Sequence, residues 1–330
     1  MKPFPSSPPP PLKPRPWNFP EQVVRQATPG VDVVVVRMPA LPIVSVRWCF
    51  LSAGLFEDVE AVGSAALLQR LLRHGTLDED AKHFARQLDR RGIRLGTQVS
   101  ADSMIVSVTA LREYLRDAIQ IANDVAFRPR LPKSALAMER MRAQHAVNQA
   151  GSQVESIVGL RLNQAVYGSH PYGRPPSTIS GLQKTNLEDI RSLQKRIVGN
   201  TKAMLLVVGD VEPHQTAEAL AKTVSELPVS HAPESVQPVP VSRHSGGVWL
   251  VERPGAEQVA IGVAALAPPR NHPDFLPLRV VNHILGGGAS SRLFARLRDQ
   301  EALTYGAYSR LDCGRWAGDL TANLTVAPPK

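Results

Sequence analysis

The chain has 330 residues, of which 43% are hydrophobic, and this composition excludes a wholly disordered protein and favours two folded domains. No apolar run approaches the length of about 18 residues that indicates a membrane span, and the first 20 residues are rich in proline without the apolar core of a secretory signal. The net charge of +9 is scattered, and without a recognition motif it indicates a solvated basic surface suited to acidic partners or peptides rather than nucleic acid.

After a proline-rich tail at 1–20, the pattern predicts a first domain over 21–227. Strands are expected at 33–36, 43–51, 93–100, 104–110 and 203–211. Helices are expected at 65–72, 78–91, 114–126, 132–167, 186–198 and 212–227. The first two strands flank Pro39 and Pro42 and are interpreted as a pair, and the long helix has weak points at Gly151 and Gly159.

A stretch rich in proline and serine, 228–246, predicts a linker to a second domain at 247–330. There the order strand–strand–helix–helix–strand–strand recurs. The expected strands are 247–254, 257–266, 304–313 and 318–326, and the expected helices are 274–287 and 291–302. We therefore predict an α+β fold of tandem duplicated two-layer sandwiches. The second copy lacks counterparts of the later elements of the first, so we expect it to be truncated.

The two cysteines, Cys49 and Cys313, lie in strand-like segments and are too few for a disulfide framework or a four-thiolate zinc site. Buried free thiols in a reducing, cytoplasmic compartment are the expected state. Nine histidines occur, and no two have the i, i+4 spacing of a helical zinc pair.

Three consecutive glycines, Gly286, Gly287 and Gly288, precede a segment of helical spacing. A phosphate-binding loop requires a buried strand before the glycines, and the P-loop type requires a lysine after them, but here a helical segment precedes and no lysine follows. The glycines are therefore expected to join two helices, with a left-handed backbone at the helix end.

Several segments together resemble the insulinase, pitrilysin and mitochondrial processing peptidase family. In the second half these are "RPGAEQVAIGVAA" and "LGGGASSRLFARLRDQEALTYGAY", and in the first half "LPIVSVRWCFLSAGLFED", "HPYGRP" and "VVGDV". The resemblance implies two homologous α/β halves that enclose a peptide. It also implies a zinc site formed by H-x-x-E-H on a helix of the first half and a distal glutamate about 76 residues further on.

This chain departs from that zinc site at every required position. The resemblance places Ala66, Gln69 and Arg70 where the family has histidine, glutamate and histidine, and the distal position falls near Ala146. Alanine cannot ligate a metal, glutamine cannot accept the proton of a bound water, and an arginine repels a dication. We therefore expect no catalytic residue, metal or cofactor on this chain. A substitute site from His74, Glu139 or His145 is disfavoured because the spacing directs these side chains to different faces.

The substrate-binding half of the resemblance is intact. Arg298 and Tyr305 match the family's "LR" and "TY" elements in identity and spacing. The resemblance implies that the arginine holds a peptide carbonyl through its planar fork of donors and that the tyrosine hydroxyl contacts the reacting carbonyl. The residues alone favour an ordinary surface side chain for Arg298 and a half-buried strand residue for Tyr305, and only the resemblance favours peptide contact.

These patterns lead to the hypothesis of a subunit that is inactive alone, binds the peptide substrate, and pairs with a homologous subunit that carries zinc. A purely structural subunit of an assembly without proteolysis is the alternative. A basic nucleic-acid-binding protein is a weaker alternative, which predicts strongly salt-dependent association with DNA or RNA.

Overall fold

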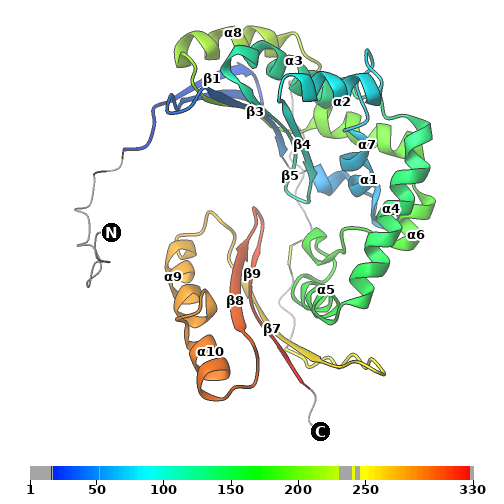
Figure 1. Ribbon diagram of the computed structural model, residues 1–330, viewed down its shortest axis with the longest axis vertical. Coiled ribbons are helices and arrows are strands. Elements are labelled where there is room, and N and C mark those ends of the chain that lie inside the picture. Colours follow the sequence, from blue (N-terminus) through cyan, green and yellow to red (C-terminus); the bar gives the residue numbers. More distant parts are fainter. Residues whose placement is uncertain (1–15, 17, 52, 230–239, 242–245, 328–330) are drawn as a thin grey trace, which may run out of the picture.

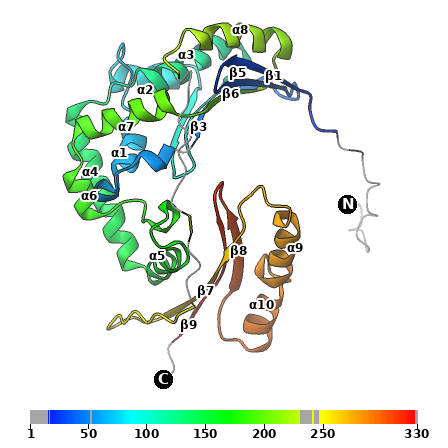
Figure 2. The same ribbon diagram turned by 180° about the vertical axis from the view of Figure 1, so that it is seen from behind.

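The computed structural model describes residues 16, 18–51, 53–229, 240–241 and 246–327. Most of the predicted tail and of the predicted linker therefore lies outside the described residues. Within them, the chain forms two α+β units, each with its own sheet (Figures 1 and 2). None of the helices in these ranges is long and apolar enough to cross a membrane.

The first unit has a six-stranded sheet in the order β1-β2-β6-β3-β5-β4. Its strands are β1 (Gln22–Thr28), β2 (Val31–Arg37), β3 (Ile43–Leu51), β4 (Arg94–Val99), β5 (Ser103–Leu111) and β6 (Ala203–Gly209). Its α-helices are α1 (Ser64–Leu71), α2 (Ala81–Arg90), α3 (Leu115–Phe127), α4 (Lys133–Ser152), α5 (Val154–Tyr167), α6 (Ile179–Lys184), α7 (Leu187–Asn200) and α8 (Pro213–Ser225). Only β2 and β6 pair in parallel.

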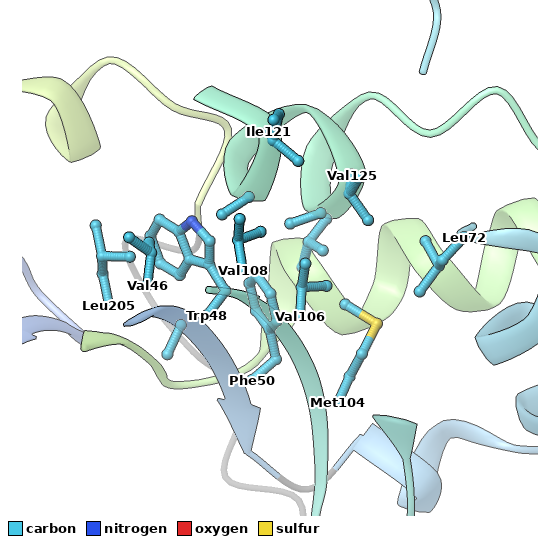
Figure 3. Close-up of a cluster of buried hydrophobic side chains, with 14 of the residues drawn as sticks. Val46, Trp48, Phe50, Leu72, Met104, Val106, Val108, Ile121, Val125 and Leu205 are labelled. Carbon is cyan, nitrogen blue, oxygen red and sulfur yellow. The ribbon is translucent and has the colours of Figure 1, made fainter. Parts of the chain in front are cut away.

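The core of this unit lies between the sheet and its helical layer (Figure 3). Trp48 and Phe50 on β3 are fully buried, and their rings stack with centroids 5.5 Å apart. The indole Nε1–H of Trp48 donates to Asn123 Oδ1 at 2.8 Å, which satisfies the one polar group that the ring brings into the core. Alternate residues of β3 and β5 point into this core, as expected for strands buried on one face.

The second unit has a three-stranded antiparallel sheet in the order β7-β9-β8. Its elements are β7 (Val259–Ala267), α9 (Phe275–Gly286), the single turn α10 (Arg292–Phe294), the π-helical turn η5 (Ala295–Gln300), β8 (Ala307–Cys313) and β9 (Gly318–Val326). Helix α9 packs against β8, and α5 packs against β7 on the other side of the sheet (Figure 1). The contact with α5 is close: a Cβ on Gly262 of β7 would lie 2.5 Å from Val158 Cγ1.

Several sequence-based expectations are wrong in detail. The strands at 33–36 and 43–51 are not neighbours, because β6 lies between β2 and β3. The break in the long helix falls at Gln153, whose extended backbone ends α4 and begins α5, and not at either glycine. Residues 247–254 form no strand. The thiols of Cys49 and Cys313 are free, as expected, but half-buried rather than buried.

Candidate functional site

The residues that stand at the positions of the expected zinc motif lie on α1, and they contact neighbouring parts of the fold. Gln69 Oε1 accepts a hydrogen bond from the backbone N–H of Val99 at 3.1 Å. Its backbone carbonyl accepts one from Thr97 Oγ at 2.8 Å, so both groups of Gln69 hold β4. Ala66 lies one turn earlier on α1 and is half-buried. Gln69 therefore anchors the outer strand of the first sheet and has its side-chain oxygen engaged.

Arg70 belongs to a network around one buried carboxylate. Glu139 on α4 is only 4% exposed. Its Oε1 lies 3.1 Å from His74 Nε2 and accepts from Arg142 Nη1 at 2.8 Å. Arg70 Nη1 lies 3.6 Å from the other oxygen, Oε2. Cationic groups thus surround Glu139 on both oxygens, which offsets the cost of burying its charge. The expectation that His74 and Glu139 face apart is wrong.

These residues do not fit a zinc ion. Glu139 is the only carboxylate of this network, and its oxygens are occupied by arginine and histidine nitrogens. Ala146 lies two turns further along the same face of α4 and is exposed, as is His145. Across the described ranges, no group of three or more His, Cys, Asp or Glu side chains is arranged to hold a metal.

Arg298 and Tyr305 flank the turn between η5 and β8. Arg298 is exposed, with its guanidinium carbon 4.6 Å from the centre of the Phe294 ring, a cation–π contact that orients the side chain. Tyr305 is 94% exposed and precedes β8 rather than lying in it. The three-stranded sheet lies between α10 and α5 (Figures 1 and 2). Arg298 and Tyr305 are therefore exposed side chains of the second unit, whereas Ala66, Gln69 and Arg70 lie on α1 of the first unit.

The glycines join two helices, but the expected left-handed backbone is wrong. Gly287 has φ −78°, in the right-handed region. The need for glycine is steric: a Cβ on Gly286 would lie 2.2 Å from the backbone nitrogen of Ser309 on β8. A Cβ on Gly287 would lie 2.7 Å from His283 Cα, whereas one on Gly288 would meet nothing closer than 3.9 Å. The segment is a close helix-to-strand contact and not a phosphate loop.

A polar cluster between the two units was not predicted from the sequence. Tyr172, in the 3-10 turn η4 (Pro171–Gly173), donates to Asp102 Oδ1 on the β4–β5 turn and accepts from the backbone N–H of Trp316 at 3.3 Å. Asp102 Oδ2 accepts from the backbone N–H of Arg315 at 3.1 Å. The β4–β5 turn of the first unit and the β8–β9 turn of the second are therefore linked through one tyrosine. The "HPYG" segment contained this tyrosine, but nothing in it indicated the partners.

A second tyrosine completes this interface. Tyr167 at the end of α5 donates to Asp319 Oδ2 of β9 at 2.6 Å, and both residues are buried. Burial raises the pKa of Asp319, and the hydrogen bond from Tyr167 opposes that rise. Burial and then the bond to Asp319 raise the pKa of Tyr167, and burial lowers the pKa of His170 beside it. At this interface the neutral forms of Tyr167, Tyr172 and His170 are therefore favoured.

Comparison with known proteins gives matches along most of the chain. Residues 33–178 match the family model described as Insulinase (Peptidase family M16), and residues 184–330 match the one described as Peptidase M16 inactive domain. The Helicobacter pylori protein named non-peptidase homolog YmxG is 25% identical over 291 residues, which are 88% of this chain and 66% of that protein. An uncharacterized zinc protease of Mycobacterium leprae is 26% identical over 310 residues, 93% of this chain and 69% of its own length.

Solved structures show the same fold. A peptidase M16 inactive domain from Pseudomonas fluorescens superposes with a TM-score of 0.85 at 23% identity, over 93% of this chain and 74% of that one. A protease from Helicobacter pylori gives a TM-score of 0.82 at 19% identity, over 94% and 76%. This chain spans about two thirds of the length of the Helicobacter pylori non-peptidase homolog and of the Mycobacterium leprae protein. The two family models meet between residues 178 and 184, although β6 and α8, which follow, pack in the first unit.

Proposed function

Because the chain belongs to the insulinase (peptidase M16) family, we propose that it is a non-catalytic, substrate-binding subunit of a two-subunit zinc peptidase. A homologous subunit with an intact H-x-x-E-H motif supplies the zinc and the base that activates water. This subunit supplies Arg298 and Tyr305. The proposal includes a cytoplasmic location, an extended peptide as substrate and no role in binding nucleic acid.

One contrast carries the proposal. The two motif positions that would ligate zinc hold Ala66 and Arg70, and the position of the base holds Gln69; Gln69 and Arg70 are engaged within the fold. Arg298 and Tyr305 are exposed, and a tyrosine that is 94% exposed contributes almost no packing to the fold. Catalytic residues have been replaced by structural ones, whereas side chains that suit a peptide remain available.

The chemistry of the pair suits an extended peptide. The guanidinium of Arg298 is a rigid fork of N–H donors, and its stacking on Phe294 restricts its orientation. It can donate to one or two carbonyl oxygens of a peptide backbone. The Tyr305 hydroxyl can donate to the carbonyl that is attacked, where a hydrogen bond strengthens as negative charge develops on the oxygen. Zinc on the partner would polarise the same carbonyl.

Reconstitution with the zinc-bearing homologue of the same genome tests the proposal. The two chains are co-expressed, purified as a complex, and assayed with a fluorogenic peptide. Tyr305→Phe should lower kcat by on the order of 10²-fold, the usual cost of losing one donor to an oxyanion. Tyr308→Phe is the matched control, because Tyr308 is about half exposed in the adjoining strand and should leave kcat unchanged. Equal rates for wild type and Tyr305→Phe would contradict the proposal.

A structural subunit is the second candidate, and exposed apolar residues at 248–251 favour it because they indicate an assembly surface. It predicts a stable complex that hydrolyses no peptide, even with a zinc-bearing homologue present. A complex that forms and shows zinc-dependent turnover would exclude this candidate.

A further inference from the structure

The segment from Arg298 to Tyr305 leads from the helical turn η5 to β8 (Figure 1), and hydrogen bonds fix it at both ends. At the first end, Ala302 has a left-handed backbone with φ +51°. The N–H of Ala302 donates to the carbonyl oxygen of Arg298 at 3.1 Å, and the N–H of Leu303 donates to that of Leu297 at 2.9 Å. These two bonds form a Schellman motif, which usually has glycine at the left-handed position.

An alanine in this conformation indicates that the surrounding fold determines where the chain turns. Residues other than glycine rarely adopt a positive φ, because the Cβ then crowds the following carbonyl oxygen, and such residues cluster at functional sites. Ala302 is one of only two in the described part of the chain. The carbonyl of Arg298 is itself an acceptor in the motif, so its backbone is fixed relative to the chain that leads to Tyr305.

Thr304 fixes the other end of the segment. Its hydroxyl donates to the backbone carbonyl oxygen of Thr325 on β9 at 2.7 Å, and it accepts from the N–H of Gly306 at 3.2 Å. The carbonyl oxygen of Gly306, at 3.1 Å, is a second and more distant acceptor for the same proton. The bond from Gly306 to Thr304 closes a turn around Tyr305, and the bond to Thr325 attaches this turn to the sheet.

The position of Tyr305 depends on this turn. Because its side chain is 94% exposed, packing contributes little to holding it. The ladder between β8 and β9 begins at Ala307, opposite Leu324, so Tyr305 lies outside the ladder. Thr304 is half-buried and Ala307 is buried, which means that the backbone is anchored on each side of the exposed side chain. The Thr304 hydroxyl is therefore the group that ties the Tyr305 turn to β9.

We propose that Thr304 is a positioning residue of the peptide site: its hydroxyl holds the turn that presents the Tyr305 hydroxyl to the carbonyl under attack. Thr304 does not touch the substrate and acts only through Tyr305. A displacement of about 1 Å near a reacting centre can lower a rate by on the order of 10²-fold, so one anchoring hydrogen bond is enough to affect turnover. This role rests on the function proposed for Tyr305 and adds to it the residue that sets its geometry.

A double-mutant cycle in the complex with the zinc-bearing homologue tests this role. Thr304→Val keeps the shape of the side chain but removes the hydroxyl, so kcat should fall by about tenfold or more. KM should change little, because Arg298, which holds the peptide in the proposed function, is untouched. Thr304→Ser keeps the hydroxyl and should keep kcat close to that of wild type. The double variant Thr304→Val with Tyr305→Phe should be no slower than Tyr305→Phe alone, because Thr304 has nothing to position once the Tyr305 hydroxyl is gone.

Thr321→Val is the matched control. Thr321 is also a half-buried threonine of the second sheet, and its hydroxyl lies 3.5 Å from the carbonyl oxygen of Arg310 on β8 rather than beside a group of the Tyr305 turn. The same loss of a hydroxyl should leave kcat unchanged there.

Hydrogen exchange in the isolated chain needs neither partner nor substrate. Thr304→Val should speed exchange of the Gly306 amide by on the order of tenfold, because this N–H loses its acceptor. Thr304→Ser and Thr321→Val should leave that rate unchanged. Equal rates in wild type and Thr304→Val would show that the hydroxyl does not hold the turn.

The outcomes separate this role from the proposed function. If Tyr305→Phe lowers kcat and Thr304→Val does not, the role of Thr304 is wrong while the proposed function stands. Additive losses in the double variant would also refute the role, since Thr304 would then act on something other than Tyr305. A Thr304→Val chain that no longer assembles with its partner would contradict a role confined to positioning. If Tyr305→Phe itself leaves kcat unchanged, the proposed function fails, and Thr304 has no catalytic group to position.

Discussion

Arg70 Nη1 lies 3.6 Å from Glu139 Oε2, so a guanidinium from α1 faces a buried carboxylate on α4. In the zinc-binding arrangement that the motif implies, this position of α1 carries a histidine and the helix is joined to its neighbour through the metal. Here the pair of Arg70 with Glu139 connects α1 to α4 instead, and the other oxygen of Glu139 contacts His74, just after α1, and Arg142, on α4 itself. A side-chain network around Glu139 therefore joins the two helices in this chain.

Removing the carboxylate should therefore destabilise the fold. Glu139→Ala deletes contacts to three partners and leaves space in a buried position, so the free energy of unfolding should fall by about 2 kcal/mol. The cost stays moderate because Arg70 and Arg142 are both more than a third exposed and regain water. Urea denaturation measures the change. Glu218→Ala on an exposed face of α8 is the control, and equal midpoints for the two variants would contradict this account.

Restoring the motif should create a metal site. Ala66→His and Arg70→His place two imidazoles one turn apart on α1, beside the buried carboxylate of Glu139, which faces position 70. Together with Gln69→Glu, these changes should yield about one zinc per chain by metal analysis after dialysis. The variant with Ala66→His alone should bind far less. Stoichiometric zinc in the unaltered chain would contradict the conclusion that its residues do not fit the metal.

The interface between the two units should respond to pH through Asp319. Burial raises the pKa of this carboxyl in the folded state. A raised pKa means that its stabilising contribution is fully present below the unfolded value and is lost as pH rises through the folded value. Asp319→Asn keeps an acceptor for the Tyr167 hydroxyl but cannot ionise. The stability of the variant relative to wild type should therefore increase as pH rises above about 4, the ordinary pKa of an aspartate.

Urea denaturation at several pH values measures this difference. Asp312 and Arg310 also face Asp319 and act on its pKa in opposite directions, so Asp312→Asn is a useful comparison. Removing the Asp312 charge should move the transition of Asp319 toward lower pH. A stability difference between Asp319→Asn and wild type that is independent of pH would refute the assignment.

The triple glycine provides a steric test with an internal control. Gly286→Ala places a Cβ against the backbone of Ser309 and should lower the free energy of unfolding by about 1–3 kcal/mol. Gly288→Ala has open space and should be nearly neutral. Thermal denaturation compares the two. If both variants melt together, the close approach of α9 to β8 does not explain the need for glycine.

The sequence predicts local elements better than long-range relationships. Strand β9, for example, matches its expected bounds of 318–326, and α7 (Leu187–Asn200), which Asn186 caps, lies close to the expected helix at 186–198. The sequence does not predict strand β1, because Arg25 and Gln26 interrupt its alternation of apolar and polar residues. The position of β6 between β2 and β3 cannot be predicted either, because hydrophobic patterns describe only residues that are close in sequence. The apolar residues 248–251 predicted a strand, but a strand needs a partner, and none is present in the described part of the chain.

Some features of the candidate site could be predicted from the sequence and others could not. The loss of the zinc motif could be predicted from the sequence, because alanine cannot ligate zinc, glutamine cannot act as a base and arginine repels a dication. The pairing of His74 with Glu139 could not, because it depends on how α1 packs against α4. The polar link through Tyr172 was also hidden, since its partners Asp102 and Trp316 lie far away in sequence.

The most direct test of the central claim is the rate of peptide hydrolysis by the complex of this chain with its zinc-bearing homologue when Arg298 is replaced by alanine. Arg296→Ala is the matched control, since Arg296 is also exposed on η5 but pairs with Glu301 at 2.7 Å. We expect Arg298→Ala to lower kcat/KM by on the order of 10²-fold with zinc content and complex assembly unchanged, and Arg296→Ala to have little effect. Unaltered kcat/KM in the Arg298→Ala complex would contradict the proposal that this chain is a substrate-binding subunit.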